Sequence, residues 1–260
     1  MKSEWEHRQE IVDIGQRMYR RGYVAATDGN ISIKMADERI LITPAGVCLG
    51  ELRPEELVAT ELGGTVCDQH QRPSSELPMH LEVYGQRPDV GAVIHAHPPL
   101  ATAFTVAGIS LAQCVIPEVV LTMGTIPTTQ YATPSTEQGR EQVRELIRCH
   151  DALILDRHGT LTVGPDLITA YRRLEKVEHA AQVTLAARQL GNVRTLPAEE
   201  VRRLEAMRAE LGLGKSVEVC SNCGTCGKGI AEEPASAPQV DERVVNVVVE
   251  EVLRALGEKA

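Results

Sequence analysis

The most informative run in the chain is Val90-Gly91-Ala92-Val93-Ile94-His95-Ala96-His97-Pro98-Pro99. Its apolar first half predicts a strand, and the two prolines end that strand because proline cannot donate to a strand ladder. Side chains two residues apart in a strand share one face, so both histidines are expected to point the same way at the strand's end. Imidazole is a common metal ligand, and this spacing suits two ligands of a zinc ion, although an isolated pair of this kind is more often structural.

The composition is typical of a globular protein with one substantial core. Of 260 residues, 43% are hydrophobic and 24% are charged, and the 3% aromatic content means that aliphatic side chains must form the core. A net charge of -9 argues against binding to nucleic acid or to acidic lipid. No apolar run reaches the roughly 18 residues of a membrane span, and the first residues are unlike a signal peptide. We therefore expect a cytoplasmic protein.

Hydrophobic periodicity predicts that helices and strands alternate along most of the chain. Helices are expected over 4–21, from 74–75 to 85, and over 100–107, 135–148, 166–190 and 198–211. Strands are expected over 31–33, 39–43, near 58–60, and over 90–97, 152–155 and 160–163. The apolar stretch 115–120 carries Glu118, which is either exposed at a strand end or functional. In the long helix, Glu178 and its charged neighbours are either surface groups or contacts between helices.

Three places in the first third of the chain could bind an anion. Ser74 and Ser75 precede a predicted helix, where free amides and hydroxyls favour phosphate, although capping alone would explain them. The turns at Asn30 and Gly46 offer backbone amides, but such turns more often connect strands.

Four residues together predict a metal site with a defined chemistry. They are Glu76, His95, His97 and His158, the last of which also follows directly on a strand. Three imidazoles and a carboxylate form a tetrahedral zinc shell in which the carboxylate can yield its place to substrate oxygens. Such a site suits deprotonation next to a carbonyl, with the displaced carboxylate carrying the proton.

In this order the motifs resemble the class II aldolase/adducin family, in particular its L-fuculose-1-phosphate aldolase branch. The matching pieces are Asp28-Gly29-Asn30-Ile31-Ser32, Ile42-Thr43-Pro44-Ala45-Gly46, Ser74-Ser75-Glu76, His95-Ala96-His97, Tyr131-Ala132-Thr133 and His158-Gly159. The resemblance implies an α/β fold with three layers, α/β/α, around a mainly antiparallel sheet. It also implies a homotetramer with its sites at subunit interfaces.

The resemblance assigns roles to particular residues. Glu76, His95, His97 and His158 match the ligands of one zinc ion per subunit, and Glu76 also matches the residue that moves the substrate proton. The substrate phosphate is expected at Gly29, Asn30, Ala45, Gly46, Ser74 and Ser75. The implied reaction is retro-aldol cleavage of L-fuculose or L-rhamnulose 1-phosphate to dihydroxyacetone phosphate and L-lactaldehyde. The alternative is a sugar-phosphate dehydratase or decarboxylase of the methylthioribulose-phosphate type with the same metal site.

Position 76 separates branches of the family, and other positions depart from the fuculose enzyme. The related epimerases carry Asp where this chain has Glu76. Ala45 stands where the fuculose enzyme has Thr. Ile116 stands where that enzyme has a tyrosine that acts as the acid and protonates the leaving aldehyde. We assign the role of second acid/base to Glu118, two residues further on.

The predicted catalytic domain covers 1–214 and is followed by an appendage. Residues 215–240 are expected to be a flexible linker in which Cys220, Cys223 and Cys226 either bind a metal or remain free thiols. Residues 241–260 predict an amphipathic helix. This helix resembles the encapsulation peptides that carry enzymes into bacterial microcompartments, which implies shell proteins as partners; the alternative is a helix packed on its own subunit.

Overall fold

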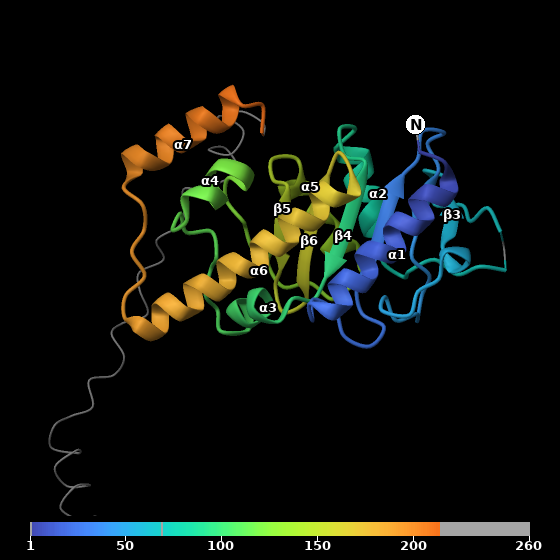
Figure 1. Ribbon diagram of the computed structural model, residues 1–260, viewed down its shortest axis with the longest axis horizontal. Helices are drawn as coiled ribbons and strands as arrows, with labels where there is room; N and C mark the ends of the chain where they lie inside the picture. Colours follow the sequence, from blue (N-terminus) through green and yellow to red (C-terminus); the bar gives the residue numbers. More distant parts are fainter. Residues whose placement is uncertain (1, 69, 214–260) are drawn as a thin grey trace, which may run out of the picture. The chain divides into compact units, whose positions relative to one another are not determined.

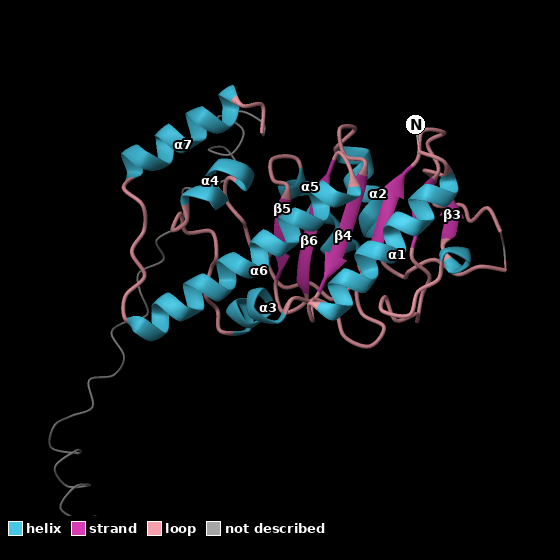
Figure 2. Cartoon of the chain, in the orientation of Figure 1, coloured by secondary structure: helices cyan, strands magenta, loops and turns pink. Residues whose placement is uncertain are grey.

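The computed structural model describes residues 2–68 and 70–213. The helices are α1 Glu4–Arg20, α2 Leu77–Gln86, α3 Pro99–Val106, α4 Pro117–Met123, α5 Glu137–Ile147, α6 Leu167–Leu190 and α7 Ala198–Glu210, with a short 3-10 helix, η1, at Pro54–Glu56. The strands are β1 Asn30–Lys34, β2 Ile40–Ile42, β3 Val58–Thr60, β4 Ala92–Ala96, β5 Ala152–Leu155 and β6 Gly159–Gly164. Figure 2 shows the strands side by side with helices around them.

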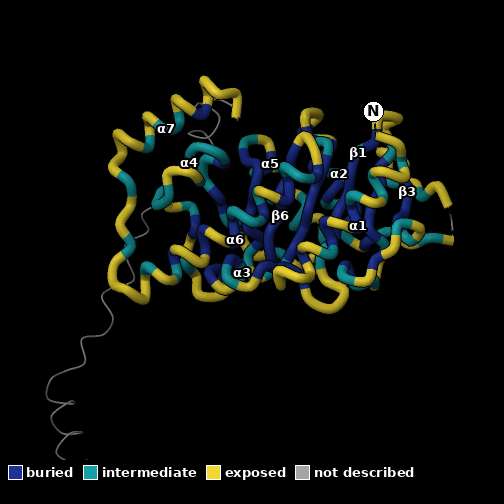
Figure 3. The backbone as a smooth tube through the Cα atoms, viewed as in Figure 1, coloured by how far each residue is buried: buried dark blue, intermediate teal, exposed yellow. Residues whose placement is uncertain are grey.

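The six strands form one sheet in the order β3-β2-β1-β4-β6-β5. Every neighbouring pair is antiparallel. The α/β fold with a central antiparallel sheet is therefore confirmed. In Figure 3 the strands are almost entirely buried, whereas α7 is largely exposed.

Helices cover both faces of this sheet, because alternate strand residues are apolar on each side. On one face, alternate aliphatic residues of β1 and β4, such as Ile31 and Ile94, pack against α1 and α6 (Figure 1). On the other face, Val93 and Leu161 belong to the cluster that includes apolar residues of α2 and α5. A third cluster joins α3, α4 and α6 near β5.

The register of β4 brings the predicted site to one end of the sheet. His95 of β4 pairs with Asn30 of β1 on one side and with Leu161 of β6 on the other. His95 shares the face of Val93, which is the face covered by α2. The end of β4, the start of β6 and the start of α2 consequently meet.

Glu178 settles one alternative left open by the sequence. Its side chain is 8% exposed, and its two carboxylate oxygens accept hydrogen bonds from the backbone amides of Leu100 and Ala101, each at 2.9 Å. These amides lie in the first turn of α3, where a helix has no carbonyl partners of its own. Glu178 is therefore a contact between helices α6 and α3.

One local prediction is corrected, and the element that carries Glu118 is identified. The second helix begins at Leu77, and Glu76 rather than a serine occupies the N-cap position, because the Ser74 hydroxyl instead accepts the amide of Glu76 at 3.3 Å in a tight turn. The stretch around Glu118 is the helix α4, with Pro117 at its first position, where proline is favoured.

The predicted linker 215–240, with its three cysteines, and the predicted helix 241–260 lie outside the described residues. Among the helices of the described part, none is long and apolar enough to cross a membrane.

Candidate metal and catalytic site

Three histidines meet at the end of the sheet. His95 lies in β4, His97 follows its last residue, and His158 lies between β5 and β6. Their ring centroids are 4.6–5.0 Å apart, and one nitrogen from each ring lies within 4.8 Å of the others. The structure thus brings together the three predicted imidazole ligands, which are separated by up to 63 residues in sequence.

The proton on His95 is placed by its backbone contact. His95 Nδ1 lies 2.9 Å from the carbonyl oxygen of Thr160, so Nδ1 must carry the hydrogen and donate it. Burial lowers the pKa of His95 well below its ordinary value, with the charges of His158 and His97 acting in the same direction. The ring is therefore neutral, and its Nε2 lone pair faces the cluster, 2.9 Å from Nε2 of His97.

Glu76 lies beside this cluster at the start of α2. Its Oε2 is 3.2 Å from His95 Nε2, and its Oε1 is 3.5 Å from His158 Nε2. The side chain is 12% exposed. All four predicted metal ligands therefore lie together in the structure.

A buried chain of hydrogen bonds holds the Glu76 carboxylate from behind. Asn30 Nδ2 donates to Glu76 Oε2 at 2.8 Å, and Asn30 Oδ1 lies 2.6 Å from His80 Nε2. His80 Nδ1 lies 2.7 Å from Ser32 Oγ, which lies 2.8 Å from the hydroxyl of Tyr84. Each of these four residues is at most 4% exposed.

The chemistry of the side chains fixes which atom donates in each hydrogen bond between Glu76 and Tyr84. Since a carboxylate only accepts, the Asn30 amide nitrogen faces Glu76 and its oxygen faces His80. Burial lowers the pKa of His80 to about 3, so the ring is neutral and donates from Nε2. Its Nδ1 must then accept from Ser32, and Ser32 accepts from Tyr84. This series of hydrogen bonds gives Glu76 one donor whose own position is fixed, the amide of Asn30.

Sequence reasoning missed His80. A helical signal was available, because His80 lies four residues after Glu76 and so one turn above it on the same face. What the sequence could not show was that Asn30, 50 residues earlier, occupies the space between them.

Two glycines permit the close packing around the histidines. A Cβ on Gly159 would lie 2.2 Å from the carbonyl oxygen of Ala96 and 2.8 Å from His97 Cδ2. At Gly29, where φ is +77°, a Cβ would lie 3.0 Å from the carbonyl oxygen of His95. Both positions therefore exclude larger residues next to the site.

The segments that carry the predicted phosphate residues are tied together by backbone hydrogen bonds. Thr43 donates to Ile31, and Ser74 donates to Thr43, at 3.1 and 3.0 Å. The amide of Ala45 is occupied by the carbonyl of Arg72 at 3.0 Å, so Ala45 is the weakest of the six candidates. Asn30 uses its side-chain amide on Glu76, and its backbone belongs to strand β1, where it pairs with His95 of β4. The others, Gly29, Gly46, Ser74 and Ser75, remain predictions.

A hollow opens beside Glu76 and His158. It measures about 40 Å³ and is also lined by Ser75, Met79 and residues 132–136 of the loop before α5. This volume is small for a sugar phosphate within one subunit. The loop 132–136 contains two residues of the matching motif at 131–133, so that motif lies at the site.

Glu118 lies elsewhere in the described subunit. It occupies the first turn of α4, is exposed, and does not line the hollow beside Glu76. The subunit alone does not bring Glu118 to the histidines, so its acid/base role stays a prediction.

The donor set fits a divalent metal ion. Three imidazole nitrogens and two carboxylate oxygens converge, and His95 presents a lone pair toward its neighbours rather than a hydrogen. Nitrogen and oxygen donors in this number suit a catalytic zinc or a similar ion with a position left for substrate. The backbone bond of His95 and the Asn30 bond of Glu76 are the outer contacts that orient such ligands.

Comparison with known proteins identifies the family. Residues 9–185 match the family model of the class II aldolase and adducin N-terminal domain. Because the match covers more than half of the chain and agrees with the fold and the histidine cluster, the chain belongs to this family. It is therefore an enzyme of the class II aldolase type, and the predicted resemblance is confirmed.

Relatives within the family differ in the reaction that they carry out. A 3-oxo-tetronate 4-phosphate decarboxylase of Pectobacterium atrosepticum is 30% identical over 210 residues, which cover 78% of this chain and 94% of that protein. An L-fuculose phosphate aldolase of Methanococcus vannielii is 35% identical over 176 residues, which cover 67% and 93%. The crystal structure of YgbL from Escherichia coli, described as an aldolase/epimerase/decarboxylase, superposes with a TM-score of 0.73 at 30% identity over 78% of this chain and 99% of that one.

Proposed function

We propose that the protein is a zinc-dependent lyase that breaks a carbon–carbon bond of a phosphorylated deoxyketose. The leading substrates are L-fuculose and L-rhamnulose 1-phosphate, with dihydroxyacetone phosphate and L-lactaldehyde as products. The observation that carries the proposal is the convergence of His95, His97 and His158 on a carboxylate that is itself held by Asn30. The aldolase relatives at 31–35% identity support the same reaction.

The residues of the chain would divide the work. The three histidines and Glu76 would hold the ion, which when bound supplies a Lewis acid for the substrate oxygens. As the bond to the aldehyde breaks, its electron pair stays on the dihydroxyacetone fragment, and Glu76 would deliver the proton to that carbon. A second group must accept the proton of the hydroxyl that becomes the aldehyde. Glu118 is proposed for it, supplied by a neighbouring subunit of a homotetramer.

The first test measures cleavage directly. Purified zinc-loaded protein is mixed with each of the two ketose phosphates, and dihydroxyacetone phosphate is followed by a coupled assay. We expect release that stops on chelation and returns with zinc. A matched control, His158→Ala, should bind little zinc and release nothing. No release by fully zinc-loaded protein would overturn the aldolase proposal while leaving the metal site intact.

Decarboxylation is the second candidate. The relatives named 3-oxo-tetronate 4-phosphate decarboxylase support it, and so does the absence of a tyrosine at Ile116. Loss of carbon dioxide leaves the same kind of enediolate, so the same residues would act. Release of carbon dioxide from 3-oxo-tetronate 4-phosphate, without cleavage of either ketose phosphate, would favour it. Dehydration of a methylthioribulose-type phosphate belongs in the same substrate panel.

The predicted assembly is tested separately. The proposal places a homotetramer in the cytoplasm, with the segment 241–260 as a targeting helix for microcompartment shell proteins. Light scattering should give four subunits. Deleting 235–260 should preserve activity in solution and abolish co-assembly with shell proteins; loss of the tetramer on deletion would instead favour a helix packed on the enzyme itself.

A further inference from the structure

A second, positively charged cavity lies at the opposite end of β4 and β6 from the histidines. It measures about 660 Å³, within the range of small-molecule sites. Val90, just before β4, and Gly164, the last residue of β6, mark its position, whereas the histidines adjoin Ala96 and Gly159. Its charged lining residues are Arg87, Asp89, Asp151, Arg172, Arg173 and Lys176.

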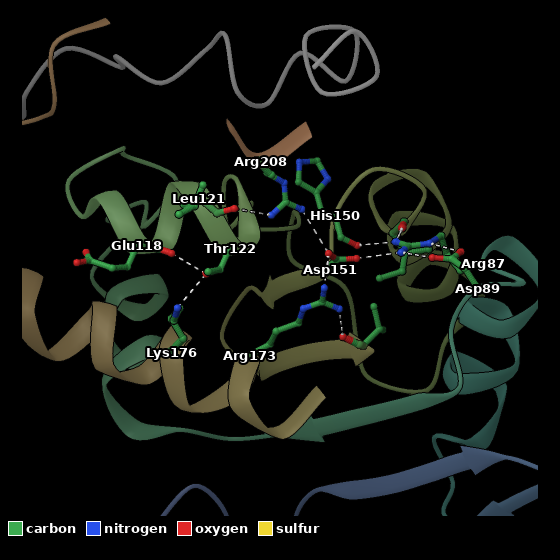
Figure 4. A network of polar contacts seen from close by, with 12 residues as sticks. Arg87, Asp89, Glu118, Leu121, Thr122, His150, Asp151, Arg173, Lys176 and Arg208 are labelled. Atoms are coloured by element: carbon green, nitrogen blue, oxygen red, sulfur yellow. Dashed lines mark hydrogen bonds and ion pairs between the residues drawn. The ribbon is translucent and has the colours of Figure 1, made fainter. Parts of the chain in front are cut away.

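Two of the cations are neutralised within the fold (Figure 4). Arg87 binds Asp89 through two bonds of 2.7 and 2.8 Å and also donates to the backbone carbonyl oxygens of Ile147 and His150. Arg173 lies 2.8 Å from Asp151 Oδ2 and donates to the carbonyl oxygen of Val163 at 2.6 Å. The two carboxylates are thereby matched by two guanidinium groups.

Three further cations have no carboxylate of their own among the described residues. Arg172 is exposed and makes no side-chain bond there, while Lys176 Nζ donates to the Thr122 hydroxyl at 2.9 Å. Arg208 makes only two long contacts, one of 3.4 Å to Asp151 Oδ2, which already pairs with Arg173, and one of 3.5 Å to the carbonyl oxygen of Leu121. The cluster therefore carries an excess of positive charge.

Arg208 is the strongest sign that the charge serves a purpose. It is 8% exposed and is the only buried residue of α7. Both of its contacts lie at the outer limit of hydrogen bonding. A buried guanidinium without a close partner is costly unless an anion completes it.

Two of these positive charges also act on Arg173. The pKa of Arg173 is lowered, first by burial and then by the positive charges of Arg208 and Arg87, against the opposing effect of Asp151. One more anion in the cavity would relieve this repulsion.

We propose that this cavity is a second anion-binding site, separate from the catalytic cluster, which takes a small molecule with a phosphoryl group. Arg172 and Lys176, which line the cavity, bind the phosphoryl oxygens, because a planar guanidinium group matches them with paired hydrogen bonds and the lysine adds a point charge. Arg208 does not line the cavity, but it lies beside Asp151 of the lining and adds positive charge there. The remaining volume accommodates the body of a phosphate ester.

Chemical footprinting of Lys176 tests the site where it lies. The metal-loaded full chain is acetylated in the presence and absence of inorganic phosphate at constant ionic strength, and each lysine is quantified by mass spectrometry. We expect phosphate to slow acetylation of Lys176 several-fold and to leave Lys34 unchanged. Phosphate in the catalytic pocket cannot produce this pattern, because that pocket lies at the other end of the strands.

Two charge reversals on the same helix complete the test. Arg172→Glu places a negative charge at the cavity and should raise the phosphate concentration needed for protection by about tenfold. Arg188→Glu makes the same change of charge at an exposed position outside the cavity and should have no effect. Equal acetylation of Lys176 with and without phosphate, or equal effects of the two variants, would overturn the proposal. Both positions are exposed, and thermal unfolding verifies that each variant is folded.

Discussion

At the scale of single residues, the site depends on how firmly Glu76 is oriented. Its carboxylate lies against two imidazoles and accepts one buried amide, and that amide is in turn fixed by a neutral histidine. A carboxylate that must both approach a metal and carry a proton needs such a restraint, because a rotated carboxylate serves neither purpose.

Glu76→Gln tests the proton role without removing the shape of the side chain. The amide can still meet Asn30 but cannot carry a proton, so turnover should fall by about 10²–10⁴-fold. Zinc content, measured by elemental analysis, should remain close to one per subunit because the three histidines stay. Turnover near that of the unchanged enzyme would exclude Glu76 as the proton carrier.

His80→Ala tests the restraint on Glu76 from a distance. The change leaves Asn30 Oδ1 and Ser32 without their buried partner, which should cost about 1–3 kcal/mol of stability and let the Asn30 amide rotate. We expect kcat to fall about 10–100-fold with KM and zinc content little changed. Tyr84→Phe, at the far end of the chain, is the matched control and should retain most of kcat. An unaltered kcat in His80→Ala would show that the chain is only structural.

At the scale of elements, long-range polar contacts fix the helices around the site. Helix α2, which follows Glu76, is joined to α5 by Glu82 and Arg144, with bonds of 2.6 and 2.9 Å. On the other face, Glu178 of α6 caps α3. Both contacts join segments more than 60 residues apart, so they hold tertiary rather than local structure.

The pair between α2 and α5 should give a measurable pH dependence. The hydrogen bond from Arg144 lowers the pKa of Glu82 below its ordinary value of 4.5, despite some burial, so the folded protein favours the charged carboxylate. The stabilisation is therefore complete above 4.5 and is lost as the pH falls through the lowered value.

Glu82→Gln should accordingly destabilise the protein at neutral pH by about 1 kcal/mol or less, since Arg144 is partly exposed. The difference from the unchanged protein should shrink in acid, which urea unfolding at several pH values measures. Glu199→Gln, an exposed change on α7, should show no such trend. A deficit that is constant with pH would contradict this reading of the pair.

At the scale of the whole molecule, the candidate metal site links three separate segments of the chain. The histidines come from the end of β4 and the β5–β6 connection, and Glu76 comes from the start of α2. An ion that binds the folded protein and not the unfolded chain stabilises the fold by mass action.

Zinc at about one hundred times its dissociation constant should add about 2.7 kcal/mol, or a rise of about 5–10 °C in Tm. Scanning calorimetry of chelated and zinc-loaded protein measures this shift. His95→Ala should remove most of it. An equal shift in His95→Ala would place the stabilising ion elsewhere.

Much of the fold was predictable because its signals are local. The period of two over 90–97 placed His95 and His97 on one face, and helical spacing marked α1, α5 and α6 within a few residues. The predicted start of α2 is wrong for a local reason as well, because a serine turn replaces a serine cap. For 115–120 the sequence left the role of Glu118 open, and Pro117 begins a helix there rather than a strand.

Residue type and spacing along the chain were enough to predict most strands and to single out the three histidines and Glu76 as candidate ligands, while the layered α/β class followed from the resemblance to the family. The tertiary structure alone decided the order of the strands, the buried chain from Glu76 to Tyr84, and the charged cavity around Asp151. These features join residues tens of positions apart through bonds that depend on direction. Spacing along a chain carries no information on direction in space, so only the folded arrangement shows which polar groups meet and which remain without a partner.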